Sequence, residues 1–215
     1  MRLKVLIFMS SLLILGSNTT FAMTAGEKTA NNYIFTEKEI DTVFQKVYNI
    51  SGLQDDVTVE VIDMSTPCSE DMSGPHCREN PNHKTELYTI YVRHNAGPGY
   101  TLVISLASLR AYNGNEDWLA AALGHELTHI INKDLLNNAR HKFCHKSDAN
   151  HNQCEKDADI NGVKLANKAG YNGCAAISYW EYWESIFGSV RDSSGSAHPS
   201  SESTISYLKK ECKVG

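Results

Sequence analysis

The sequence has only one long run of apolar residues, and this run lies at the start of the chain. It covers residues 5–16, follows Arg2 and Lys4, and is followed by small and polar residues up to Ala22. It is shorter than the roughly 20 residues that a membrane-spanning helix needs. The order of basic, apolar and small residues is typical of a secretory signal peptide. We therefore expect residues 1–22 to be a cleaved signal peptide, with no integral membrane segment after it.

The chain also lacks an excess of basic residues. Its formal net charge is −5, whereas binding to nucleic-acid phosphates takes a basic patch. This excludes nucleic acid as the expected partner. Residues 23–215 are enough for one domain with its own core, and we expect a monomer.

No two cysteines have the C-x-x-C spacing of a zinc knuckle. All six cysteines follow the expected signal peptide, and an even number in an exported chain indicates disulfides. Six cysteines allow 15 pairings, so proximity in the sequence is the only guide. It predicts three bridges, Cys68–Cys77, Cys144–Cys154 and Cys174–Cys212. The disulfides and the leader together predict a periplasmic or secreted protein.

Apolar periodicity predicts a small sheet preceded by a helix. The helix begins at Thr36, whose spacing to Glu39 is a capping box, and ends at Gly52. Alternating patterns predict strands at 57–61, 88–92 and 102–106. The segment between the first two strands, from Met64 to Lys84, is rich in Pro, Gly, Asn and Ser and is predicted to be a long loop.

Four helices are predicted after the strands, which makes the fold class α+β. The first covers about 116–132 behind Asn115 as N-cap, and the second covers about 153–168 and ends before Gly170. A third covers about 174–187, and the last carries Ile205 and Leu208.

The segment 124–130 (GHELTHI) carries the motif H-E-x-x-H. His125 and His129 are four residues apart, so on a helix they lie on one face and can bind one metal ion. Glu126 lies one step further round the helix, where it can take a proton from the attacking water. The motif therefore predicts a catalytic zinc site with Glu126 as general base.

A catalytic zinc site needs a third protein ligand and an open position. Glu155 and Asp159 are four residues apart on the next predicted helix and share a face. We expect Glu155 to be the third ligand. Asp159 is expected to accept a hydrogen bond from the second nitrogen of one of the histidines, which fixes its tautomer. Small residues at Ala158 and Gly162 would let the two helices approach closely.

Two groups of side chains allow alternative interpretations. His141, His145 and His151 lie between the two helices of the predicted zinc site. They form either a second metal site or a solvated loop, and the polar composition of the segment favours the loop. The aromatic cluster in the helix at 174–187 is either core packing, which is the usual case, or a wall facing the substrate.

This combination of motifs resembles the zinc metallopeptidases that include HtpX, BepA and the CAAX prenyl proteases, within the gluzincin group. The matching stretches are 105–109, 115–117, 119–129, the Glu155-x-x-Ala158-Asp159 run with Gly162, 169–171 and the His-Pro stretch 198–202. The resemblance implies a small zincin-like domain, with a short N-terminal sheet and a helical C-terminal part that carries the active site. One position departs from the family's pattern, since Thr204 replaces the usual arginine after His-Pro.

The predicted activity is zinc-dependent hydrolysis of peptide bonds in exported or envelope proteins. The substrate oxyanion needs a hydrogen-bond donor besides the metal, and His198 or Tyr171 is expected to supply it. The resemblance places His198 near zinc, where it acts as this catalytic donor or as a gate over the open position. A surface histidine that caps the last helix is the alternative.

Two rival functions share these residues. The first is a non-catalytic zinc-bearing chaperone or binding module, and the presence of Glu126 argues against it because a structural zinc site needs no base. The second is a secreted effector protease, which uses the same chemistry at another location.

Overall fold

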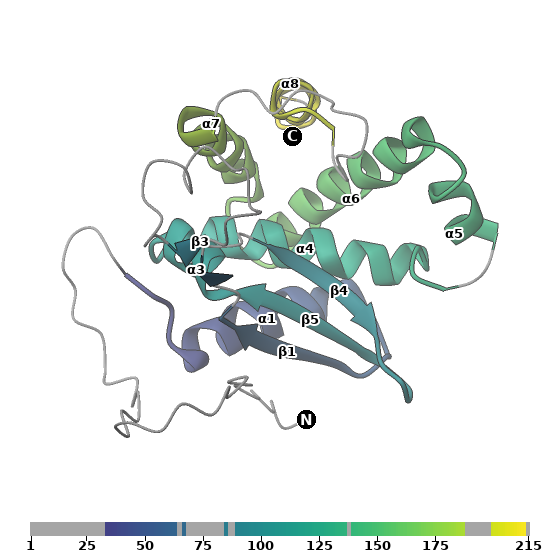
Figure 1. Ribbon diagram of the computed structural model, residues 1–215, viewed down its shortest axis with the longest axis horizontal. Coiled ribbons are helices and arrows are strands. Elements are labelled where there is room, and N and C mark those ends of the chain that lie inside the picture. Colours follow the sequence, from purple (N-terminus) through teal and green to yellow (C-terminus); the bar gives the residue numbers. More distant parts are fainter. Residues whose placement is uncertain are drawn as a thin grey trace.

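The computed structural model describes residues 33–63, 66–67, 84–85, 89–136, 139–187 and 199–213. The elements in chain order are α1 (Glu37–Ser51), β1 (Val57–Ile62), β2 (Thr66–Pro67), β3 (Lys84–Thr85), β4 (Ile90–His94), β5 (Tyr100–Ser105), α3 (Leu106–Tyr112), α4 (Glu116–Asn132), α5 (Ala139–Cys144), α6 (Asp148–Lys168), the 3-10 helix η1 (Gly173–Ala175), α7 (Ala176–Phe187) and α8 (Ser201–Glu211). Helix α4 crosses the middle of the molecule in Figure 1, with the sheet below it and α7 and α8 above it. The expected α+β class is confirmed.

The main sheet has the strand order β1-β5-β4, with β5 in the centre. Strand β1 pairs with β5 in parallel, and β4 pairs with β5 antiparallel. All six residues of β5 are buried, whereas β1 alternates between buried and half-buried residues. This is the pattern of a central strand beside one that meets the core on a single face.

The strand that was predicted at 102–106 ends one residue earlier, at a helix that the sequence analysis missed. The side chain of Ser105 accepts a hydrogen bond from the Ser108 amide and so caps α3. Leu106 therefore belongs to the helix. The predicted loop at 64–84 is also wrong at its ends, because β2 and β3 form a short antiparallel pair.

Helix α1 forms where the sequence predicted it. The Thr36 side chain accepts a hydrogen bond from the Glu39 amide, and the Glu39 carboxylate accepts one from the Thr36 amide. Gly52 ends the helix with φ of 72°, a left-handed conformation that glycine adopts without strain. The buried face of α1 packs against the sheet and α4.

Two of the later helices differ from their predicted bounds. Helix α6 begins at Asp148 rather than near residue 153, because the Ser147 side chain caps it through the Asn150 amide. Helix α5 and the first turn of α6 replace much of the solvated loop that was expected around the three histidines. Helix α7 begins at Ala176, after a turn of 3-10 helix.

Two glycines allow α4 and α6 to approach closely. A Cβ atom on Gly124 would lie 2.6 Å from the backbone oxygen of Gly162, and one on Gly162 would lie 2.5 Å from the backbone nitrogen of His125. Both distances are far below van der Waals contact, and both neighbours are backbone atoms that cannot rotate away. Close packing at this point is what brings the side chains of the two helices within reach of one ion.

Replacing Gly162 with alanine should therefore separate the two helices. We expect the free energy of unfolding to fall by about 1–3 kcal/mol, the usual cost of overpacking, and binding of a metal ion between the two helices to weaken with it. Urea denaturation and a metal competition assay measure the two effects. Gly97→Ala is the matched control, because nothing lies within 4 Å of its new Cβ atom; equal losses in both variants would contradict the role of Gly162.

Two of the three expected disulfides are confirmed. Cys144 bonds to Cys154, and Cys174 bonds to Cys212, each with a Cα–Cα distance of 5.9 Å. The third expected pair, Cys68–Cys77, lies outside the described residues. Among the helices that the structure describes, none has both the length and the apolar character that crossing a membrane requires.

Candidate metal centre

The H-E-x-x-H motif lies in the C-terminal half of α4. Asn115 caps the helix through the Trp118 amide, and the helix ends where Lys133 adopts a left-handed conformation with φ of 60°. His125, Glu126 and His129 are all buried. Both predicted bounds of this helix and its N-cap agree with the structure.

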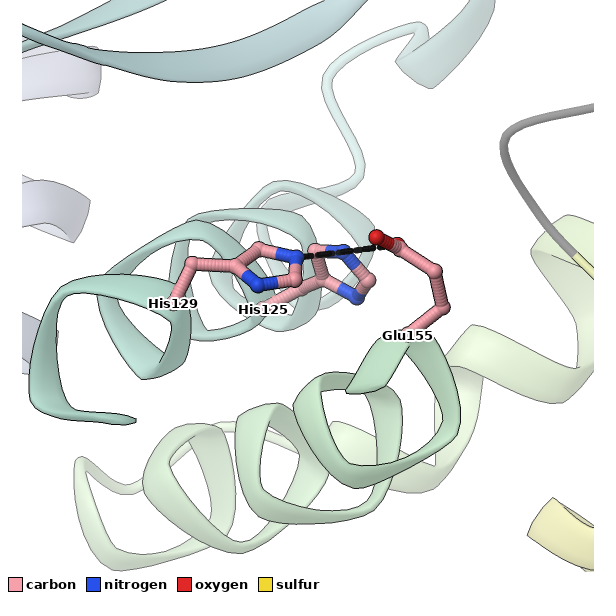
Figure 2. A group of neighbouring side chains, drawn as sticks. All are labelled: His125, His129 and Glu155. Atoms are coloured by element: carbon pink, nitrogen blue, oxygen red, sulfur yellow. Dashed lines mark hydrogen bonds and ion pairs between the residues drawn. The ribbon is translucent and has the colours of Figure 1, made fainter. Parts of the chain in front are cut away.

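Glu155 approaches the two histidines from α6, the helix packed against α4. Figure 2 shows its carboxylate directed at the two imidazole rings, which project from neighbouring turns of α4. Glu155 Oε2 lies 3.3 Å from His125 Nε2 and 3.6 Å from His129 Nε2. The two Nε2 atoms lie 3.1 Å apart. Three potential ligand atoms therefore form a compact buried triangle.

The size of this triangle fits zinc. In a tetrahedral site with zinc bonds of about 2.0–2.1 Å, two ligand atoms are about 3.3–3.4 Å apart. The three distances of 3.1, 3.3 and 3.6 Å bracket that value. Two imidazoles and one carboxylate also leave the fourth position open, as catalytic zinc sites do. The donor set therefore fits a divalent metal ion.

Each histidine is held by a carboxylate at its other ring nitrogen. His125 Nδ1 lies 2.8 Å from Asp159 Oδ1, and His129 Nδ1 lies 2.9 Å from Asp134 Oδ2. An ionised carboxylate only accepts hydrogen bonds, so each Nδ1 donates and each Nε2 can present a lone pair to the ion. Asp159 makes the contact that its helical spacing predicted. The sequence analysis missed Asp134.

The end of α4 brings Asp134 back onto the motif. The left-handed turn at Lys133 reverses the chain, and the Asp134 amide donates to the carbonyl oxygen of His129 at 3.0 Å. Arg140 then holds the Asp134 carboxylate at 2.9 Å and reaches Asp157 of α6 at 2.8 Å. An acid shortly after the helix was the only sequence signal for Asp134, and its position depends on the conformation of Lys133.

Helix α8 supplies a further contact that the sequence did not indicate. The Tyr207 hydroxyl donates to Asp159 Oδ2 and lies 3.1 Å from the Thr204 hydroxyl oxygen. Burial and the nearby Asp159 carboxylate raise the pKa of Tyr207, so it remains a hydrogen-bond donor. Thr204 is buried and contributes to this contact.

The carboxylates around the histidines determine their protonation in the metal-free protein. Burial lowers the pKa of His129, but hydrogen bonds to Asp134 and Glu155 raise it by more, to about 9. His125 shows the same balance, and the Asp159 carboxylate holds its pKa well above the ordinary value. The pKa of Glu126 is raised by burial, although the two histidines and the Val92 amide partly offset this.

A cavity of about 320 Å³ opens beside Glu126 and His125. It is lined by the first residue of β4 and by residues of α3, α4, α6, α7 and α8. Most of the surface is apolar, with large aromatic side chains on one side. The aromatic lining residues are Tyr112, Trp118, Tyr179, Trp180 and Trp183. The aromatic helix α7 thus packs against the core through Tyr179 and also forms a wall of the cavity.

The remaining expected site residues lie elsewhere or outside the described chain. His198 is not among the described residues. Tyr171 is absent from the lining of the cavity, and its ring lies 5.0 Å from the Lys46 amino group of α1. A second convergent group, Asp134 with Cys144 and Cys154, offers no thiolate because the two sulfur atoms form a disulfide.

Replacing Asp134 with asparagine should weaken metal binding by about 10–100-fold, the usual effect of losing a carboxylate behind a histidine ligand. The amide keeps the size of the side chain but holds the His129 ring less firmly. Competition with a chromogenic chelator measures the affinity. Asp55→Asn, at an exposed position, is the control, and an unchanged affinity in the Asp134 variant would show that this carboxylate does not support the site.

No protein-family model and no curated protein sequence matches the chain. The assignment of a function therefore rests on the chemistry of this site.

Proposed function

We propose that this protein is a zinc-dependent endopeptidase. The observation that carries the proposal is the buried triangle of His125 Nε2, His129 Nε2 and Glu155 Oε2, with a further carboxylate, Glu126, beside it at the edge of a cavity. A metal site that only stabilises a fold has no use for an additional buried carboxylate at an open position. This combination favours hydrolysis over a non-catalytic zinc-bearing chaperone or binding module.

Glu126 would act as the general base and then as the general acid. A bound zinc ion would polarise the scissile carbonyl and lower the pKa of the attacking water. Glu126 Oε1 lies 4.0 Å from His125 Nε2, outside the ligand triangle but adjacent to it. Its raised pKa suits a carboxylate that takes a proton from water and returns it to the departing amine.

The cavity indicates the kind of peptide that would bind. Trp180 and Trp183 of α7 form an apolar wall near Glu126, so a large apolar side chain next to the scissile bond would be preferred. Strand β4 is at the edge of the main sheet, and its first residue, Ile90, lines the cavity. An extended peptide could add to this edge as a further strand. The proposed substrate is therefore an unfolded or extended segment of a protein.

The resemblance to the HtpX, BepA and CAAX prenyl protease group agrees with this proposal and extends it to a zincin-like fold. It also suggests that His198 completes the site as an oxyanion donor or as a gate. The disulfides suit an oxidising compartment, so we propose exported or envelope proteins as substrates, in the periplasm or outside the cell. A secreted effector protease would use the same site.

A library of synthetic peptides tests the proposal. The full chain should cleave internal bonds next to large apolar residues, lose this activity with a metal chelator and regain it with zinc. Mass spectrometry of the products identifies the cleaved bonds. Cleavage that continues after the metal has been removed, or zinc-loaded protein that cleaves no member of the library, would overturn the proposal.

A further inference from the structure

Three histidines that the proposed reaction does not use gather next to the candidate metal centre. His141 and His145 are four residues apart, and the His145 amide donates to the carbonyl oxygen of His141 at 3.0 Å, so both lie on one helical turn at the end of α5. His151 and Glu155 are four residues apart on α6. Each pair has the spacing that places two side chains on one helix face. Helix α5 is in contact with α6, and Figure 1 shows it next to the start of that helix.

The ring of His145 contacts the rings of both other histidines. The ring centroids of His141 and His145 lie 4.3 Å apart, and those of His145 and His151 lie 5.8 Å apart. The two histidines of the H-E-x-x-H motif, which fit one ion, have centroids 4.8 Å apart. The His141–His145 pair is as close as the pair in the motif, whereas the His151 ring lies further from His145.

One hydrogen bond and one contact with a carboxylate orient two of these side chains. His141 Nδ1 lies 2.7 Å from the backbone oxygen of Asp134, which can only accept, so Nδ1 donates; this tautomer is the one that binds a metal ion through Nε2. His151 Nε2 lies 3.6 Å from Glu155 Oε1. The other oxygen of that carboxylate, Oε2, belongs to the first ligand triangle. Glu155 therefore presents one oxygen to each group of histidines.

The two helices that carry these histidines are tied together. The disulfide between Cys144 and Cys154 joins α5 to α6 directly beside the cluster. Arg140 of α5 also pairs with Asp157 of α6 at 2.8 Å. The backbone is thus held in place before any ligand binds. His145 is exposed, so its ring is able to turn its lone pair toward an ion, a motion that surface side chains make within nanoseconds.

We propose that His141, His145 and His151, with Glu155 Oε1, form a second binding site for a divalent metal ion, next to the first and joined to it through the Glu155 carboxylate. Three imidazoles suit zinc, copper or nickel. The site should bind more weakly than the first triangle, because His145 is exposed and must reorient. This site does not depend on peptidase activity, and the protein could hold it even if the first site catalysed no reaction.

Zinc alone is a sufficient probe. Equilibrium dialysis of the metal-free full chain, followed by metal analysis, should find two zinc ions per chain, one of them bound more weakly. The His145→Ala variant, changed at an exposed position, should lose the weaker ion and keep the tighter one with its affinity unchanged within about threefold. His94→Ala should retain both ions, since His94 is exposed and its ring contacts Tyr100 in the sheet instead.

The first site can be removed separately. A double variant, H125A/H129A, should retain the weaker ion, which separates failure of this proposal from failure of the proposed function. Copper bound to that variant should show nitrogen hyperfine splitting in its electron paramagnetic resonance spectrum, and His145→Ala should alter the splitting. One zinc ion in the parent protein, or a weaker ion that persists in His145→Ala with unchanged affinity, would overturn the second site.

Discussion

Replacing Glu126 with glutamine should reduce kcat by about 10²–10⁴-fold, the range that general acid and base catalysis contributes. The amide keeps the shape of the side chain but cannot take a proton from water. Zinc content should remain the same, because Glu126 lies outside the triangle of ligand atoms. Metal analysis and a peptidase assay on the same preparation give the two results.

The control for this experiment is Glu116→Gln, which makes the same change at an exposed position in the first turn of the same helix. It should alter neither kcat nor zinc content. If the Glu126 variant cleaves peptides as fast as the parent protein, Glu126 is not the general base. If it loses its zinc, the carboxylate has a role in binding the metal instead.

Zinc affinity should fall steeply as the pH is lowered, by about tenfold per pH unit below pH 9, if binding displaces one proton. The Nε2 atoms of His125 and His129 lie 3.1 Å apart and can share one hydrogen between them. Carboxylates raise the pKa of both rings, that of His129 to about 9. The metal-free pair therefore holds a proton at neutral pH that zinc must displace. Calorimetry in buffers of different ionisation enthalpy counts the protons released.

The raised pKa of His129 also affects the stability of the metal-free protein, which should fall as the pH rises, whereas zinc affinity should increase. A histidine whose pKa is higher in the folded state than its ordinary value of 6.5 contributes stability that is complete below that pH. This contribution is lost as the pH rises through about 9. Asp134→Asn is the internal control, because it removes the carboxylate that raises the pKa of His129. It should shift the pH dependence of zinc affinity and that of stability to lower pH. Zinc affinity that does not change between pH 6 and pH 8 would show that the site is unprotonated before the metal binds.

Local sequence patterns determined the elements that carry the candidate site. The capping box at Thr36, the N-cap Asn115 and the 3.6-residue period of α4 each satisfy backbone groups or bury a face within a few residues. Such interactions act within one segment, and no partner is needed to recognise them. The pairing of His125 with His129 was visible for the same reason, since a spacing of four places both on one face of any helix.

Some contacts between segments could also be predicted from the sequence, but only where a further pattern supported them. Glu155 and Asp159 could be assigned because they share a face of a helix that has a glycine, Gly162, for close packing. Pairing by proximity also succeeded for Cys144 with Cys154 and for Cys174 with Cys212. The residues at 141–151 were expected to form a solvated loop. They lie largely in α5 and in the start of α6, which Ser147 caps earlier than the apolar pattern indicated.

Tertiary structure alone decided which polar groups surround the site. Asp134 reaches His129 through a left-handed turn at Lys133, a conformation that the identity of that residue does not predict. Tyr207 follows Asp159 by 48 residues in the sequence and reaches it because α8 packs against α6. The meeting of His145 with His151 likewise depends on how α5 and α6 are held together. Hydrogen bonds of this kind depend on distance and direction in space, and a linear sequence pattern does not encode these. Helix caps and helical spacing depend on separation along the chain, which a sequence pattern does encode.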